Sequence, residues 1–115
     1  MLNIYGPETL KIIISEAKTA ANKASMKYLD ETLKGEDNYP CGFAWVNIWK
    51  IKGNTKQGKS MKAAGLEKDY NGAYSIWNPG GLSVQNVDVK EAGASAAADV
   101  FTRYGFNATS GSRLD

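Results

Sequence analysis

The chain contains no histidine, and this absence removes most of the familiar catalytic and metal sites. Ser-His-Asp and Cys-His nucleophiles, His-ligated zinc and the usual proton shuttle near neutral pH all need that side chain. We therefore expect no catalytic residue, no bound metal and no cofactor, and we interpret the chain as a binding protein. An enzyme that uses lysine, tyrosine or carboxylates stays open as an alternative.

Cysteine is almost absent too, since Cys41 stands alone. A single cysteine excludes an internal disulfide framework and is typical of a reducing cytoplasm. We expect Cys41 to be a small buried apolar side chain, with a reactive thiol as the alternative. No apolar run approaches the roughly 20 residues of a membrane span, and residues 1–7 do not resemble a secretory signal.

What the chain does have is an ordinary globular composition, with 43% hydrophobic and 23% charged residues over a length of 115. That length predicts one domain, 1–115, with an N-terminal helix within 1–35 and a sheet with further helices over 41–112. Pro7 opens the first helix, and apolar residues recur at three- and four-residue steps from Leu10 to Tyr28. The helix is expected to end near Lys34 and Gly35.

Six shorter elements follow. Residues 42–51 read as a strand and 54–64 as a short helix. The segments 70–77 and 82–87 read as a hairpin around the turn 78–81. Asp88 and Glu91 form a capping box for a helix that ends at Gly105, and 106–110 reads as a final strand. The predicted fold class is α+β: a long helix, then a β-α-β-β-α-β, ferredoxin-like (split-βαβ) sheet with helices on one face.

The strand 42–51 is apolar on both faces, which is typical of a central strand. One of these faces is expected to carry Phe43, Trp45, Asn47, Trp49 and Ile51. Aromatic side chains on an open sheet face can stack on bases, as they do in RNA-recognition modules. We expect instead that the long helix covers this face and that the tryptophans belong to the core. The basic-aromatic octapeptide of RNA-recognition modules is absent.

A stretch without acidic residues carries five lysines: Lys50, Lys52, Lys56, Lys59 and Lys62. Such a run can contact nucleic acid, a nucleotide or an acidic protein, although a solvated surface explains it as well. Within it, residues 53–60 match the P-loop pattern G-x-x-x-x-G-K-[ST] letter for letter. The short following helix and the lack of a later strand ending in aspartate argue against a P-loop.

The start of the last predicted helix is a possible anion site, because helix N-termini attract anions. Asp88 and Glu91 are equally able to occupy those N–H groups. The candidate ligand-binding residues of the whole chain are Trp45, Asn47, Trp49, Lys56, Lys59, Gln85, Lys90 and Arg113.

Three segments, 40–46 (PCGFAWV), 90–94 (KEAGA) and 111–115 (GSRLD), resemble a family of small uncharacterised proteins of tailed bacteriophages. The resemblance extends over nearly the whole chain and implies no catalytic residues. It implies the cytoplasm of an infected bacterial cell and an accessory, host-takeover or anti-defence role.

The leading hypothesis is therefore an accessory phage protein that binds a host protein or a small anionic ligand such as a nucleotide signal. A homodimer is one form that this protein could take. The alternative is single-stranded nucleic-acid binding through the sheet aromatics and the lysine run. Nucleotide binding by a P-loop at 53–60 is a second alternative.

Overall fold

The structure is a computed structural model and describes residues 4–115. It begins with the long helix α1, Pro7–Glu31, with proline in its first turn. The apolar stripe read from the sequence is buried along one side of α1: Leu10, Ile13, Ile14, Ala17 and Ala21. The prediction of a long N-terminal helix with a small-residue stripe is thus confirmed.

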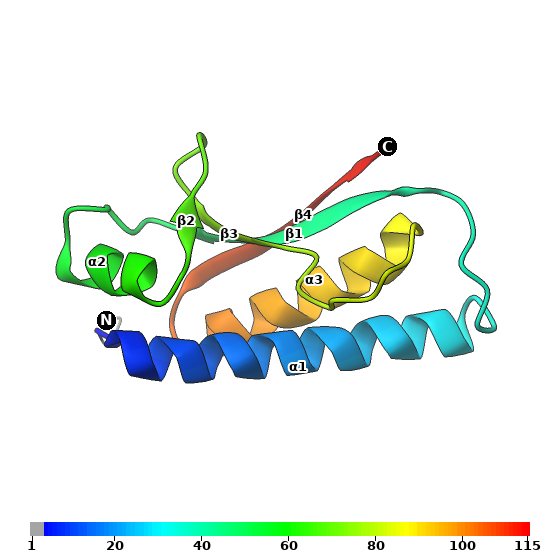
Figure 1. The fold of residues 1–115 in the computed structure, drawn as a ribbon, viewed down its shortest axis with the longest axis horizontal. Coiled ribbons are helices and arrows are strands. Elements are labelled where there is room, and N and C mark those ends of the chain that lie inside the picture. Colours follow the sequence, from blue (N-terminus) through cyan, green and yellow to red (C-terminus); the bar gives the residue numbers. More distant parts are fainter. Residues whose placement is uncertain (1–3) are drawn as a thin grey trace.

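Four antiparallel strands form one sheet in the order β2-β3-β1-β4 (Figure 1). The two central strands are β1, Gly42–Trp49, and β3, Tyr74–Trp77. The edges differ in length, because β2 is only Glu67–Lys68 whereas β4 is Asn107–Leu114. β1 pairs with β4 along its whole length.

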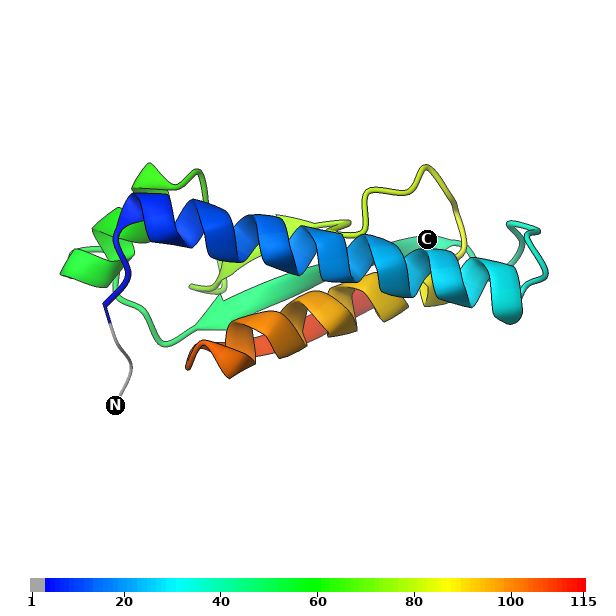
Figure 2. The same ribbon diagram turned by 90° about the horizontal axis from the view of Figure 1, so that it is seen from below.

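Both long helices lie on the same side of this sheet (Figures 1 and 2). Helix α3, Val87–Arg103, packs under β1 and β4, and α1 packs mainly against α3. The two helices approach closely because Gly93 of α3 meets α1: a Cβ there would overlap Ser25 Oγ. Ser25 Oγ also donates a hydrogen bond to the Val89 carbonyl at 2.7 Å. The α1 stripe is therefore used against a helix, not against the aromatic face of the sheet.

The third helix, α2, Lys56–Ala63, lies at the end of the sheet where β1 runs out. Its N-cap is Thr55, whose hydroxyl accepts from the N–H of Gly58 at 3.1 Å. Gln57 ties α2 to the start of α1, with one hydrogen bond to the Tyr5 carbonyl and one from the Tyr5 N–H.

The predicted hairpin between 70–77 and 82–87 is wrong. β3 pairs with β1 and with the short β2, while 82–86 runs as an irregular connection with one bridge, Cys41 to Asn86. Gly80 in this connection packs on α1, where Asn22 donates a hydrogen bond to its carbonyl at 2.8 Å. The turn residues therefore return the chain to the helices rather than to a paired strand.

The cap of the last helix is also corrected. Asn86, not Asp88, is the N-cap of α3, and its Oδ1 accepts from the Val89 N–H at 3.0 Å. The side-chain nitrogen of Asn86 donates to the carbonyls of Asn38 and Tyr39, so one residue caps α3 and holds the loop before β1.

The α+β class and the long helix are confirmed, and the two long helices lie on one face of the sheet (Figure 1). The arrangement departs from the ferredoxin-like expectation in two ways: the second and third strands are not the predicted segments, and α2 lies beyond the sheet instead of on its face. Within residues 4–115, no helix is long and apolar enough to cross a membrane.

Candidate functional site

The face of the sheet opposite the helices is open (Figure 1). Alternation along β1 places Ala44, Val46 and Ile48 in the core, whereas Phe43 and Trp45 lie on the other side and remain partly accessible. The predicted division into two faces is confirmed within β1, but Ile51, predicted on the aromatic face, lies beyond β1 and is buried in the core. The expectation that α1 covers the aromatic side is wrong.

The centre of this face is a pair of stacked indoles. Trp45 is the register partner of Trp77 on β3, and their ring centroids are 4.8 Å apart with an interplanar angle of 29°. Trp45 lies close against Gly111 of β4, while Trp77 keeps 55% of its surface exposed. Trp77 is thus supported on one side and accessible on the other, as a stacking platform must be.

Two cations surround Phe43 at one end of the face. Lys90 Nζ lies 5.1 Å from the centroid of the Phe43 ring, and Arg113 Cζ lies 5.5 Å from it. Arg113 Cζ is also 6.0 Å from the Trp77 centroid. Lys90 reaches this position from α3 by donating a hydrogen bond to the Gly42 carbonyl at 2.8 Å.

These two cations lack a carboxylate partner. Across residues 4–115, the one ion pair is Lys11–Glu8 on α1, which involves neither Lys90 nor Arg113. Lys90 Nζ uses one proton on Gly42, which leaves two for a ligand. An anion placed over the Phe43 end would therefore meet two unneutralised charges.

Asn47 is a buried polar residue further along the same face of β1. Its side-chain amide lies 3.2 Å from Ser75 Oγ, which lies 2.9 Å from Asp69 Oδ2. Both neighbours offer an acceptor oxygen, Asn47 Oδ1 and Asp69 Oδ2, and the Ser75 hydroxyl has one proton to donate to either. Burial acts to raise the pKa of Asp69, but hydrogen bonds from the Ala73 N–H, the Ser75 hydroxyl and the Asn71 N–H outweigh it and lower that pKa.

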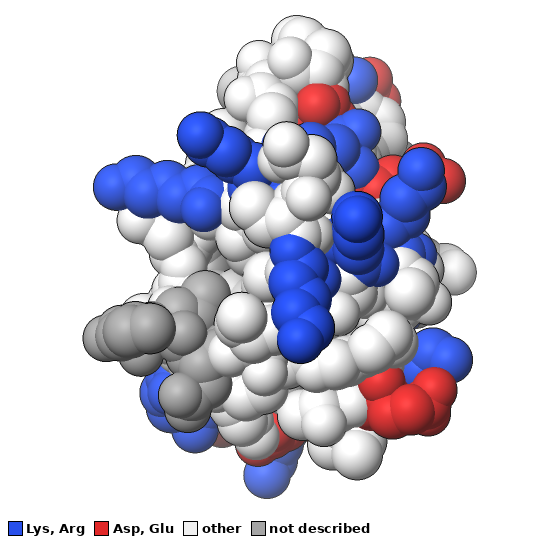
Figure 3. Space-filling view, turned by 90° about the vertical axis from the view of Figure 1, so that its left-hand side faces the viewer, with Lys and Arg blue, Asp and Glu red and all other residues white. Residues whose placement is uncertain are grey.

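Trp49 closes the face at the other end of β1, where its indole N–H donates to Thr109 Oγ1 at 2.8 Å. The chain then continues directly into the lysine run. Figure 3 shows this end of the molecule, with lysine side chains extending outward across it. The exposed lysines of the run are Lys50, Lys52, Lys56, Lys59 and Lys62.

The P-loop match does not have the geometry of a phosphate cradle. Helix α2 already begins at Lys56, so Gly58 and Lys59 lie inside it. The N–H of Gly58 is bound by Thr55 Oγ1, and that of Lys59 by the Thr55 carbonyl. A Cβ at Gly58 would overlap the Lys52 carbonyl, so this glycine serves close backbone packing.

The predicted site residues thus divide into groups. The open face collects Trp45, Asn47, Trp49 and Arg113, and Lys90 reaches it from α3. Lys56 and Lys59 lie apart at the α2 end. Gln85 lies beside Cys41, with 3.4 Å between Oε1 and Sγ.

Sequence reasoning missed two members of the aromatic face, Phe43 as a cation partner and Trp77 as the stacking platform. The sequence predicts a hairpin of 70–77 with 82–87, which keeps Trp77 away from Trp45. The two indoles meet because β3 pairs with β1, and no local pattern in the sequence indicates that pairing. Residues of the segments 40–46, 90–94 and 111–115 meet here: Phe43 and Trp45, Lys90, and Arg113.

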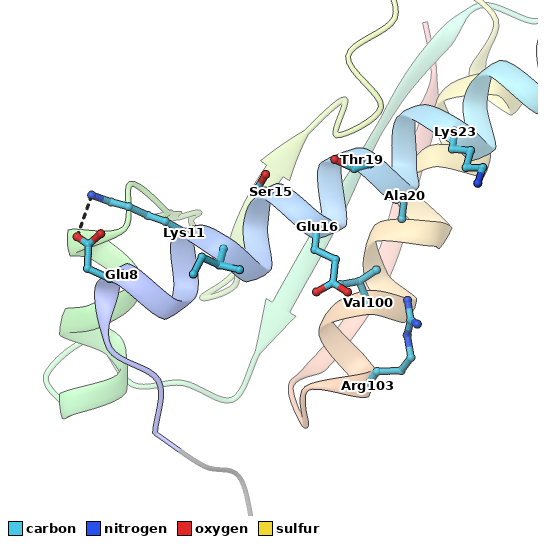
Figure 4. Close-up of a pocket in the computed structure, with 10 residues that line it drawn as sticks. Glu8, Lys11, Ser15, Glu16, Thr19, Ala20, Lys23, Val100 and Arg103 are labelled. Carbon is cyan, nitrogen blue, oxygen red and sulfur yellow. Dashed lines mark hydrogen bonds and ion pairs between the residues drawn. The ribbon is translucent and has the colours of Figure 1, made fainter.

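Other hollows of the surface are less suited to a ligand. The groove in Figure 4, about 740 Å³, lies between α1 and α3 on the side away from the sheet. Ile12 in it is 67% exposed, and the Glu16 carboxylate accepts the hydroxyl of Tyr104. Its charged groups spread along α1 rather than converging on a point.

Within residues 4–115, no cluster of three potential metal ligands exists. Comparison with models of known protein families, with curated proteins and with solved structures gives no match for this chain.

Proposed function

We propose that the open sheet face binds single-stranded nucleic acid. Bases stack on Trp77 and its aromatic neighbours, and phosphates are bound by Arg113 and Lys90. The observation that carries the proposal is the Trp45–Trp77 pair: one ring supports the other, and Trp77 keeps 55% of its surface accessible. Stacking on an aromatic ring is tolerant of sequence because every base has a π-face.

The shape of the face favours a strand over a small ligand. Pockets for small molecules are concave and enclose most of the ligand. Here the aromatic side chains follow β1 from Phe43 to Trp49, roughly 20 Å at about 3.3 Å per residue. That length suits two or three stacked bases, the number that RNA-recognition modules hold on their sheet. We propose that this sheet is a variant of the same split β-α-β arrangement, with α1 in place of the first crossover helix.

The charges support the same ligand. Lys90 and Arg113 lie at the Phe43 end of the face, and the lysine run begins next to Trp49 at the other end. A strand laid along β1 therefore meets cations at both ends and aromatic rings between them. Phosphate contacts of this kind make affinity fall as salt rises.

The test is fluorescence anisotropy with labelled single-stranded 12-mers at two salt concentrations. Trp77→Ala should weaken binding about 5- to 150-fold, the equivalent of about 1–3 kcal/mol per stacked base. Arg113→Ala should weaken binding to all sequences and reduce the salt slope by about 1. Ile12→Ala and Lys27→Ala, which change an exposed apolar residue and an exposed cation of α1, are the matched controls.

Two results would overturn the proposal. One is no binding of any 12-mer at low salt. The other is a mononucleotide that binds as tightly as the 12-mer, which would make the ligand a small nucleotide signal.

As a biological setting, we propose an accessory role in a phage-infected bacterial cell, on the strength of the sequence resemblance. In that cell, binding of single-stranded nucleic acid would keep host proteins from reaching it. Induced expression in bacteria should slow growth for the wild type and not for the double variant Trp77→Ala, Arg113→Ala. Equal growth of the two strains contradicts this role and leaves strand binding in vitro unaffected.

A further inference from the structure

The outer edge of β4 is a long backbone edge that no described residue pairs with. β4 is joined to β1 at eight successive positions, from Gly42–Leu114 to Trp49–Asn107, without a bulge. Six of its eight residues are exposed. Its outward N–H and C=O groups form a template for another strand.

The usual protections of an edge strand are missing from β4. Edges are normally blunted by proline, lysine, a bulge, short length or a covering segment. β4 has no proline and one charged residue, Arg113, and its centre is the small-residue run Thr109 to Ser112. The opposite edge, β2, is only two residues long, and both are charged.

We propose that β4 pairs antiparallel with β4 of a second copy of this chain, around a two-fold axis that passes near Ser110. An isologous contact of this kind is the commonest way for a protein to form a dimer. It gives one continuous eight-stranded sheet with both aromatic faces on the same side.

The side chains of β4 are self-complementary in this pairing. With Ser110 on the axis, Arg113 lies opposite Asn107 of the second copy, so no like charges face each other along the strands. Leu114, 66% exposed, lies opposite Phe106 of the second copy and diagonally from its Ala108. The pairing therefore covers the exposed leucine at each end and needs no large side chain at the centre.

The helices permit the same arrangement. α3 lies beneath both β1 and β4 (Figure 2), so the two copies of α3 would lie about two strand spacings apart, roughly 10 Å. That separation equals an ordinary distance between packed helices.

Sedimentation velocity of the full chain, without nucleic acid, tests the proposal between about 1 and 100 µM. A dimer of about 25 kDa, twice the 12.4 kDa of the chain, is expected for the wild type. Ser110→Lys and Ser110→Asp should each be monomeric, because each places like charges together at the axis. An equimolar mixture of the two variants should restore the dimer. Ser83→Lys, on the exposed loop before α3, is the control.

A wild type that stays monomeric at 100 µM overturns the proposal, and so does a dimer that both Ser110 variants retain. Far-UV circular dichroism checks that the variants are folded. The result is separable from strand binding, because a monomer that binds 12-mers removes only the dimer.

Discussion

The indole of Trp45 lies against the bare backbone of Gly111 on the neighbouring strand. A Cβ built at Gly111 would come within 2.6 Å of Trp45 Nε1. The missing side chain thus lets the ring settle close to β4, and in that position it stacks with Trp77. A glycine on one strand therefore sets the orientation of two tryptophans on two others.

Gly111→Ala should disturb this pair. The added methyl group pushes the Trp45 ring away from β4, and the stacking with Trp77 is lost or loosened. Near-UV circular dichroism and tryptophan fluorescence should change, and affinity for a 12-mer should fall. Ser112→Ala, one residue along and facing the other side, should change neither. An unchanged tryptophan spectrum in Gly111→Ala would contradict the proposed contact.

Gly93→Ala tests the helix layer. In an exposed helix interior this change would stabilise by about 0.8–1.0 kcal/mol. Here the new methyl group overlaps Ser25 Oγ, so we expect the free energy of unfolding to fall by about 1–3 kcal/mol. Urea denaturation followed at 222 nm measures it. Ser95→Ala, on the exposed side of α3, should stabilise slightly. A stabilised Gly93→Ala would show that α1 and α3 are not in close contact there.

Asn86→Ala should destabilise by about 1–3 kcal/mol, since it removes the α3 cap and leaves the carbonyls of Asn38 and Tyr39 without their donor. Asp88→Ala should cost less than about 1 kcal/mol, because Asp88 acts only through its charge near the helix N-terminus. Comparing the two variants by thermal denaturation separates the observed cap from the one that the sequence suggests. A larger loss in Asp88→Ala would reverse the assignment.

Asp69 should make stability depend on pH in the acid range. Its pKa is lower in the folded chain than the ordinary 3.8, so the carboxylate stabilises the fold above that pH. This stabilisation is lost as pH falls through the lowered pKa. The difference in free energy of unfolding between wild type and Asp69→Asn should therefore be positive at pH 7 and shrink below about pH 4. Urea titrations from pH 2 to 7 measure it, and a difference that does not change with pH is the contrary result.

Local patterns in the sequence predicted much of the fold. The three- and four-residue spacing predicts the buried side of α1, and the alternation predicts the two faces of β1. The alternation does not predict that the aromatic face of β1 is left uncovered. The helical character of 56–63 and 87–103 was likewise visible.

What the sequence could not supply was the partner of each surface. The alanines of α1 are suited to close packing against a helix or a sheet alike, and only Gly93 on α3 identifies the partner used. In the same way, residues 78–81 have the composition of a hairpin turn, but Gly80 meets Ser25 of α1. Both relationships join residues far apart in the chain, which local propensity does not encode.

The candidate site shows the same limit. Trp45 and Arg113 were identified separately, but their meeting around Phe43 and Trp77 depends on the register of three strands. Residues 53–60 match the P-loop sequence pattern at every position. They form no cradle because Thr55 starts the helix before the second glycine.

The hydrogen bonds between Gln57 and the backbone of Tyr5 have a consequence for work with fragments and fusions. They anchor the lysine-bearing helix to a residue 52 positions earlier, just before α1. A chain that starts at Pro7 would keep both long helices and the sheet but lose this anchor. Its α2 would then be held by the buried Met61 and by the Tyr74 hydroxyl, which donates to the Gly58 carbonyl, so amide hydrogen exchange should accelerate in 56–63.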